Sequence, residues 1–229
     1  MKLRLLSTQL KSQSLKRLAN GLSAKLGYKV FRSSKQRAHR KHLLYGNGRD
    51  KLYQYKWFQE NQIPALSFTT SQNEAAAWLA DGETLLARCL TNASEGRGIV
   101  ILEPGSPWVV APVYTRYRKK KREYRVHIFK DKIVQVLEKR KKNGVEANAK
   151  IRNTANGYVF CSQDVVEPAG ICELALAASK VTNSDFKGVD IGWNEKKNEL
   201  FVIEVNSAPG IEGSNVNLYV ETIVNEEGI

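Results

Sequence analysis

The sequence lacks any apolar run near the roughly 20 residues that a membrane-spanning helix needs. Its first 21 residues hold no continuous apolar stretch and no small-residue cleavage site, so we expect no secretory signal and no membrane partner. Only three cysteines are present, Cys89, Cys161 and Cys172, and their spacing is unlike that of a metal site. These absences predict a cytoplasmic protein whose cysteines are reduced, small, buried residues.

Acidic residues are missing from the first 49 positions, which hold 13 of the 36 lysines and arginines. The rest of the chain carries 23 basic and 23 acidic residues, so the whole formal excess of +13 lies in this block. Such a block favours an acidic partner: a nucleic acid, an acidic protein tail or a polyanionic substrate. A solubilising basic surface is the alternative interpretation.

Periodicity and capping residues predict a mixture of helices and strands without a regular βαβ rhythm, which is typical of an α+β protein with two lobes. A basic connector is expected over residues 33–49. The basic run over residues 116–125 either extends a substrate groove or contains a solvated loop at Lys119–Lys121. The main expected elements are helices over 8–26, 50–61, 71–80 and 168–183, and hairpins that join 123–129 to 132–140 and 186–193 to 199–206.

The stretch "FVIEVNSAPGIEG", residues 201–213, carries Glu204 and Asn206 within an apolar strand. Strand side chains alternate, so both point to the same face. A buried carboxylate needs a cation or hydrogen-bond donors, and two oxygen ligands can form part of a Mg²⁺ site. Antiparallel pairing with "GVDIGW" would bring Asp190 beside Glu204. The three oxygen ligands could hold one or two Mg²⁺ ions, whereas the alternative is a glutamate paired with a nearby lysine.

Phosphate-binding groups are expected on the other half of the chain. The loop "TNASEGRG" contains Gly96 and Gly98, which would let backbone N–H groups approach phosphate oxygens, although most such loops are simple hairpin turns. Arg88 is the single charge in "TLLARCL" and needs an anionic partner. Lys51 at a helix start is another candidate phosphate contact, or else a solvated lysine.

The order of "DKL", "LLAR", a glycine-rich loop, "EYRV", "GVD" and "EVNSAPG" resembles the ATP-grasp superfamily, in particular its ribosomal-protein glutamate ligase branch. The resemblance covers residues from about 46 to 221. It implies two α+β lobes with the nucleotide between largely antiparallel sheets. The implied divisions are a short basic N-terminal segment over 1–45, a small lobe over 46–110 and a large lobe with the metal site over 111–229.

The resemblance also implies roles for individual residues. Arg88 stands where the family usually has a lysine, and arginine contacts phosphate differently because its guanidinium is a planar fork. The implied roles are ATP contacts for Lys51, Arg88, Ser94, Gly96, Arg97 and Gly98, adenine contacts for Val113 and Tyr114, a ribose contact for Glu123, Mg²⁺ ligation by Asp190, Glu204 and Asn206, and catalytic contacts for Arg125, Arg152 and Asn153.

The implied activity is ATP-dependent ligation of a carboxylate to an amine through an acyl phosphate, with ATP and Mg²⁺ bound. The basic N-terminal face suggests that the substrate is an acidic protein tail or a nucleic acid. Two alternatives stay open: a basic binding module on the same scaffold, and a kinase that transfers phosphate without ligation. Asp190, Glu204 and Asn206 argue against the first alternative but not against the second.

Overall fold

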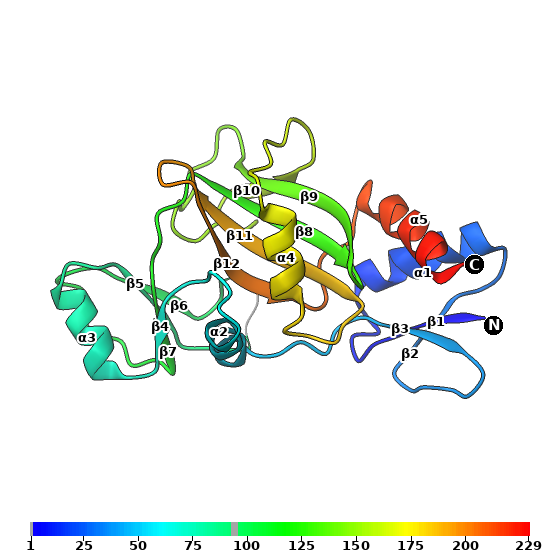
Figure 1. Cartoon of the computed structure of the whole chain (residues 1–229), viewed down its shortest axis with the longest axis horizontal. Helices are drawn as coiled ribbons and strands as arrows, with labels where there is room; N and C mark the ends of the chain where they lie inside the picture. Colours follow the sequence, from blue (N-terminus) through cyan, green and yellow to red (C-terminus); the bar gives the residue numbers. More distant parts are fainter. Residues whose placement is uncertain (1, 93–95) are drawn as a thin grey trace.

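The computed structural model describes residues 2–92 and 96–229, which fold into three regions arranged in a row (Figure 1). An N-terminal lobe and a small lobe flank a central lobe. No helix in these described ranges is long and apolar enough to cross a membrane. The three cysteines form no disulfide, and each is half-buried rather than buried as expected.

The N-terminal lobe is a parallel sheet covered by two helices. Its strands lie in the order β2-β1-β3, and its core joins both helices to the sheet. Gly21 allows the helices to approach closely, since a Cβ there would lie 2.9 Å from Val220 Cγ2. The elements are β1 (Leu3–Leu6), α1 (Gln13–Leu26), β2 (Phe31–Ser33), β3 (Lys41–Leu44) and, from the end of the chain, α5 (Asn215–Glu227).

The prediction of a connector over 33–49 is wrong for Lys41–Leu44, which forms β3. Leu43 is buried in the lobe core, and the strand pairs with β1 from Leu3↔Lys41 to Leu6↔Leu44. The prediction was based on the many lysines and arginines of this segment, which contains a single buried leucine in a strand of only four residues.

The small lobe is an antiparallel sheet in the order β4-β7-β5-β6. Helix α3 begins after Ser71, whose hydroxyl accepts a hydrogen bond from the Glu74 N–H, as its capping motif predicts. β7 lies after the division expected at residue 110 but pairs with β5 in this sheet. The elements are β4 (Phe68–Thr69), α3 (Gln72–Ala80), β5 (Leu85–Arg88), β6 (Ile99–Leu102) and β7 (Val113–Arg116).

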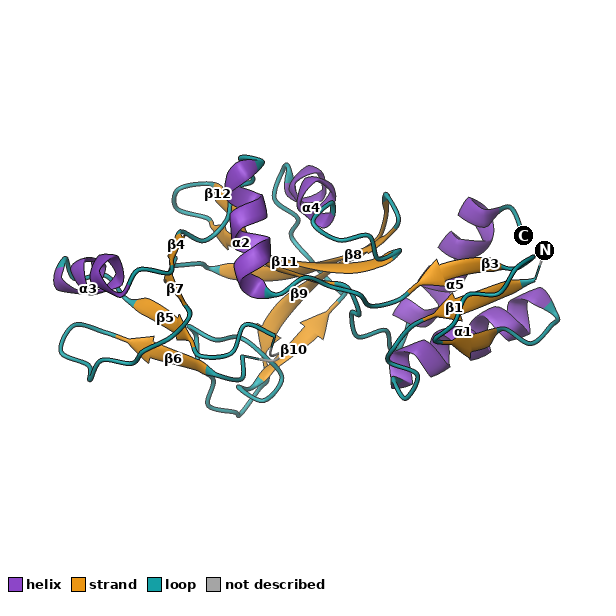
Figure 2. Cartoon of the chain, turned by 90° about the horizontal axis from the view of Figure 1, so that it is seen from below, coloured by secondary structure: helices purple, strands orange, loops and turns teal. Residues whose placement is uncertain are grey.

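The central lobe is a five-stranded antiparallel sheet in the order β10-β9-β8-β11-β12 (Figure 2). Apolar side chains of α2 and α4 pack with one face of this sheet in the largest core of the molecule. Both predicted hairpins are confirmed, as is the α+β class. The elements are α2 (Lys51–Glu60), β8 (Arg122–Phe129), β9 (Lys132–Lys141), β10 (Tyr158–Cys161), α4 (Ile171–Ser179), β11 (Phe186–Asn194) and β12 (Glu199–Asn206).

Candidate functional site

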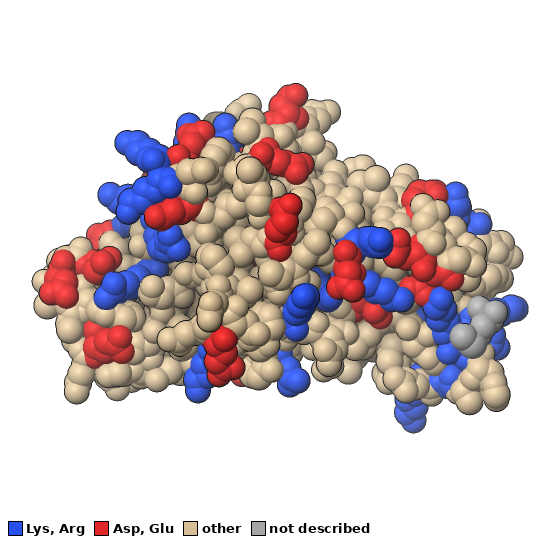
Figure 3. Space-filling view, viewed as in Figure 1, with Lys and Arg blue, Asp and Glu red and all other residues tan. Residues whose placement is uncertain are grey.

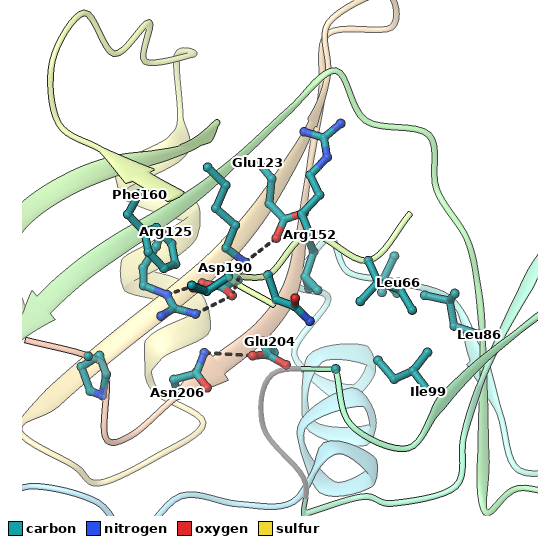
Figure 4. A pocket seen from close by; sticks show the side chains of 18 of the residues that line it. Leu66, Leu86, Ile99, Glu123, Arg125, Arg152, Phe160, Asp190, Glu204 and Asn206 are labelled. Atoms are coloured by element: carbon teal, nitrogen blue, oxygen red, sulfur yellow. Dashed lines mark hydrogen bonds and ion pairs between the residues drawn. The ribbon is translucent and has the colours of Figure 1, made fainter. Parts of the chain in front are cut away.

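A cavity of about 410 Å³ lies on the opposite face of the central sheet and receives side chains from all three lobes. Figure 4 shows its two ends: Leu66, Leu86 and Ile99 make an apolar end, whereas Asp190 and Glu204 lie at a polar end. The N-terminal lobe contributes the segment between β1 and α1. A cavity with one apolar and one charged end suits a ligand that is itself divided in this way.

A β-bulge in β12 decides which side chains face this cavity. Ile191 pairs with Val202 and Asp190 with Glu204, so Ile203 is the extra residue. Without it, alternation would place Glu204 on the core face beside Val202. With it, the cavity lining from β12 is Phe201, Ile203, Glu204 and Asn206. The predicted proximity of Asp190 and Glu204 is confirmed as direct cross-strand pairing.

Asp190 is held by two cations. Arg125 lies directly opposite on β8 and donates to both carboxylate oxygens, from Nε at 2.6 Å and Nη2 at 2.8 Å. Lys139 Nζ donates to Asp190 Oδ2 at 2.9 Å and to Glu123 Oε1 at 2.5 Å. Burial alone would raise the pKa of Asp190, but Arg125 and Lys139 outweigh it and hold the pKa well below its usual range.

Glu204 is held by Lys51, the first residue of α2, through an ion pair with its Oε2. Its other oxygen accepts a hydrogen bond from Asn206 Nδ2 at 3.0 Å. Burial would raise the pKa of Glu204, but the Lys51 ammonium overcomes that effect and lowers it to about 2. Both carboxylates are therefore ionised at neutral pH, and each already contacts positive charge.

The donor set fits Mg²⁺. Two carboxylates and the Asn206 amide offer only oxygen ligands, and Mg²⁺ usually takes one or two carboxylates together with substrate phosphates. Among the described residues, no group of three or more His, Cys, Asp or Glu could hold a metal by itself. Asp190 and Glu204 already contact ammonium and guanidinium groups, so the surroundings of both carboxylates favour positive charge.

Arg88 lines the same cavity and is 4% exposed. Its guanidinium lies over the ring of Tyr55 at 5.5 Å, and its Nε has no hydrogen-bond partner in the described part of the chain. A buried, incompletely paired cation favours an anion in the cavity. This placement agrees with the phosphate contact predicted for Arg88.

The loop between β5 and β6 lies next to the cavity through Gly96, which is a lining residue. Gly96 and Gly98 both have φ of 72°, in the left-handed region that favours glycine. The Lys51 N–H donates to the Thr91 carbonyl at 3.1 Å, which connects the start of α2 to this loop. Arg97 lies in the loop but outside the cavity lining, and Ser94 falls outside the described residues.

Val113 and Tyr114 do not line the cavity. Both are fully buried in β7, and the Tyr114 hydroxyl is occupied by the Ala111 N–H and the Val109 carbonyl, each at 2.9 Å. The chain crosses from the small lobe to the central lobe at residues 117–121, and there Tyr117, Arg118 and Lys120 line the cavity. The adenine contact implied for Val113 and Tyr114 gains no support from their position.

Glu123 lines the cavity but is 3% exposed and paired with two lysines, Lys139 and Lys120. The Lys120 side chain is only 6% exposed, so the interpretation of Lys119–Lys121 as a solvated loop is wrong for Lys120. The Phe201 ring covers Gly192, where a Cβ would lie 2.5 Å from the ring, and Arg118 lies 4.4 Å above that ring.

Arg152 and Asn153 reach the cavity from the loop between β9 and β10. The Arg152 guanidinium donates to the carbonyls of Lys120 and Lys121 at 3.0 and 3.1 Å, which hold it against the lobe crossing. Asn153 Oδ1 accepts a hydrogen bond from the Asn156 N–H at 2.7 Å. The catalytic contacts implied for both residues stay predictions.

Sequence reasoning missed Lys139 and Phe160. Lys139 joins Glu123 to Asp190, and the Phe160 ring lies 4.5 Å from the Arg125 guanidinium. A bulge in β9 is the reason for the first omission: His127 pairs with Gln135 and Ile128 with Ile133, so Val134 is extra. A regular hairpin would place Glu138 rather than Lys139 on the Arg125 face. The predicted hairpin places Lys139 on the strand next to Glu123, and this proximity could have indicated that the two side chains form an ion pair.

Comparison with solved structures finds similar folds over nearly the whole chain. The ATP-grasp ligase PsnB complexed with a minimal precursor has a TM-score of 0.71 and 9% identity over 99% of both chains. A RiPP-associated ATP-grasp ligase of Chryseobacterium gregarium, in complex with ADP and a leader and core peptide, has a TM-score of 0.64 and 13% identity over 100% of this chain and 98% of that chain. D-alanine–D-alanine ligase of Bacillus anthracis complexed with ATP has a TM-score of 0.62 and 16% identity over 100% and 98%.

The fold of this chain is therefore the ATP-grasp fold, with the cavity between its lobes. Residues 114–225 match the family model of the RimK-like ATP-grasp domain. The resemblance to the ATP-grasp superfamily predicted from the motifs is confirmed by this match and by the fold, and the similarity to the RimK-like domain indicates an ATP-dependent carbon–nitrogen ligase. Comparison with curated proteins finds no match.

Proposed function

We propose that this protein joins a carboxylate to an amine through an acyl-phosphate intermediate and converts ATP to ADP and phosphate. The observation that carries the proposal is the row formed by Arg125, Asp190 and Glu204 on three adjacent strands at the polar end of the cavity. A row of one guanidinium and two carboxylates in a cavity with an apolar opposite end supports binding of a nucleotide together with a divalent cation.

The nucleotide base lies at the apolar end, against Leu66, Leu86 and Phe201, beside the lobe crossing that contains Tyr117. This assignment replaces Val113 and Tyr114 as the base contact. The phosphates point toward Asp190 and Glu204. Lys51 and Arg88 contact phosphate oxygens, and the backbone of the loop at Gly96 covers them.

Asp190, Glu204 and Asn206 would hold one or two Mg²⁺ ions. Bound Mg²⁺ would neutralise phosphate charge. Lys51 and Arg125, which contact these carboxylates, would then be available to contact phosphate oxygens. Charge neutralisation and positioning by these residues are the main requirements of phosphoryl transfer, so a covalent nucleophile from the protein is unnecessary.

The reaction has two steps. A carboxylate oxygen of the substrate attacks the γ-phosphorus, the bond to the bridging oxygen breaks, and ADP leaves with that electron pair. The amine then attacks the acyl carbon, the bond from that carbon to the phosphate oxygen breaks, and phosphate leaves while the amine loses a proton to solvent. Arg125 lies where it can stabilise the oxygens of the transferred phosphoryl group.

The substrate is an acidic protein segment. Two observations support this choice over a small molecule: the basic first 49 residues, and the structural neighbours that were determined with precursor or leader and core peptides. Acidic side chains would also provide the carboxylate that the first step consumes. A nucleic acid at the same face is the competing partner.

Isotope transfer tests the acyl phosphate. Wild-type protein would be incubated with Mg·ATP, amines and a Glu-rich peptide whose side-chain carboxylates carry ¹⁸O, and the released phosphate would be analysed by mass spectrometry. Ligation through an acyl phosphate transfers one ¹⁸O atom to phosphate. ADP formed without free phosphate would instead support a kinase, and Mg·ATP binding without any ADP would support a binding module.

A further inference from the structure

Two groups of cations in the N-terminal lobe have different surroundings. Those near α5 are neutralised by acidic residues in or just before that helix. The ion pairs are Arg17 with Glu212 at 3.4 Å, Lys25 with Glu221 at 2.8 Å, and Lys41 with Glu227. This side of the lobe therefore contributes little unpaired charge.

The second group surrounds β2 and the turn after it. Lys29, Arg32, Lys35, Arg37 and Arg40 are exposed, and none forms an ion pair within residues 2–92 and 96–229. Figure 3 shows basic side chains over this lower right part of the molecule, while acidic side chains lie higher, toward α5. These five residues, together with Phe31, are termed the β2-edge surface.

β2 is also an edge of the parallel sheet, because within the described residues it has β1 as its only neighbour in the strand order. The Ser33 carbonyl accepts a hydrogen bond from the Ser7 N–H, so the backbone groups of Ser33 face β1 and those of Arg32 face outward. Phe31 is 46% exposed, with the Arg4 guanidinium 5.2 Å and the Lys29 ammonium 5.1 Å from its ring. The edge offers main-chain hydrogen bonds, an aromatic ring and positive charge together.

The β2-edge surface is connected to the cavity. Arg32 Nη1 donates to the Leu10 carbonyl at 2.7 Å, in the segment between β1 and α1. Gln9 and Ser12 of that same segment line the cavity, as does Ser14 in the first turn of α1. A peptide bound along β2 could therefore extend across the segment between β1 and α1 and enter the cavity.

We infer that the β2-edge surface docks an extended acidic peptide as an added strand, with the reactive carboxylate farther along the same peptide. The inference rests on the proposed function and names the surface that recognises its substrate. A free strand edge recognises the main chain of a peptide, whereas nucleic acid offers no strand to pair with it. Acidic side chains complement the five unpaired cations.

The test is fluorescence anisotropy with a short labelled peptide of alternating Glu and Thr, and with an oligothymidylate of equal charge. The test variant is Lys35→Glu/Arg37→Glu/Arg40→Glu. The matched control is Lys56→Glu/Lys196→Glu/Lys197→Glu, which reverses three exposed lysines elsewhere and changes the net charge equally. A second peptide, N-methylated at alternate residues, keeps its charge but loses main-chain donors.

We expect the test variant to weaken peptide binding about tenfold or more, since three surface charge contacts of about 0.5 kcal/mol each give that ratio. The control variant should bind like wild type, and N-methylation should weaken binding further. Equal weakening by both variants, tighter binding of the oligothymidylate, or no peptide binding at low salt would overturn the inference. Mg·ATP binding by the test variant, measured by calorimetry, separates these outcomes from failure of the proposed function.

Discussion

The cavity face of the central sheet and the β2-edge surface are both rich in Lys and Arg, but the surroundings of these cations differ. Arg125 and Lys139 form ion pairs with the buried carboxylate of Asp190 in the central sheet. Arg37 and Arg40 extend from an exposed turn and contact no acidic group of the described chain. The number of charges in a segment therefore says little about their role. Lys139 is committed to two internal carboxylates, whereas the exposed Arg37 and Arg40 are available to an external partner.

The largest expected effect is on stability, where a buried charge cluster of the cavity face is compared with an exposed ion pair of the N-terminal lobe. Asp190→Ala removes the carboxylate that pairs with the buried cations of Arg125 and Lys139. We therefore expect the free energy of unfolding to fall by about 3–5 kcal/mol. Glu221→Ala breaks the exposed pair with Lys25 and should cost less than about 1 kcal/mol. Urea denaturation of both variants measures this contrast. Similar losses would show that the central charges are not compensated as the structure indicates.

A chemical contrast follows at Glu204. Glu204→Gln keeps the shape of the side chain but removes its charge, so we expect ATP turnover to fall by at least about a hundredfold. Glu195→Gln, in the turn of the same hairpin, serves as the control and should keep wild-type turnover. Coupled detection of ADP measures both. Unchanged turnover in Glu204→Gln would remove this residue from the mechanism.

The pH dependence of stability sharpens the comparison. The pKa of Glu204 is about 2 in the folded protein against an ordinary value of 4.5. A lowered carboxyl pKa contributes stability that is complete above the ordinary value and is lost as pH falls through the folded value. We expect Glu204 to account for about 2 kcal/mol of lost stability between about pH 6 and about pH 3. Urea titrations should show that Glu204→Gln lacks this component, and an identical pH profile would contradict it.

The smallest effect on folding is expected at the β2-edge surface. Lys35→Glu, Arg37→Glu and Arg40→Glu should each change the free energy of unfolding by no more than about 0.5 kcal/mol, because these side chains are exposed and unpaired. Thermal and urea denaturation of the three single variants test this. A loss above about 2 kcal/mol in any of them would mean that the turn supports the fold and is not an available docking surface.

Much of the site could be predicted from residue types and order. The hairpin signals around Asp190 and Glu204 are local, and antiparallel pairing across a short turn brings the two strands together. The helix starts at Asp50 and Ser71 follow from side chains that cap the backbone two or three residues on. Such features depend on nearby residues and are therefore visible in the sequence.

Other features depend on distant contacts. The bulges at Val134 and Ile203 change which face a side chain occupies, and no residue at either position signals them. β3 forms because Leu43 joins a core shared with Tyr219 and Ile223 of α5, at the far end of the chain. Sequence reasoning therefore missed Lys139, and the connector expected over 33–49 was wrong for Lys41–Leu44.

The sequence by itself determined the chemical groups of this protein: the oxygen-bearing side chains of Asp190, Glu204 and Asn206, the cations of Lys51 and Arg88, and the basic block of the first 49 residues. Only the tertiary structure decided how these groups are used. Strand register sets the faces of side chains, and a single extra residue reverses them. Burial then separates the cations that hold the active-site carboxylates from those that stay free on the β2-edge surface.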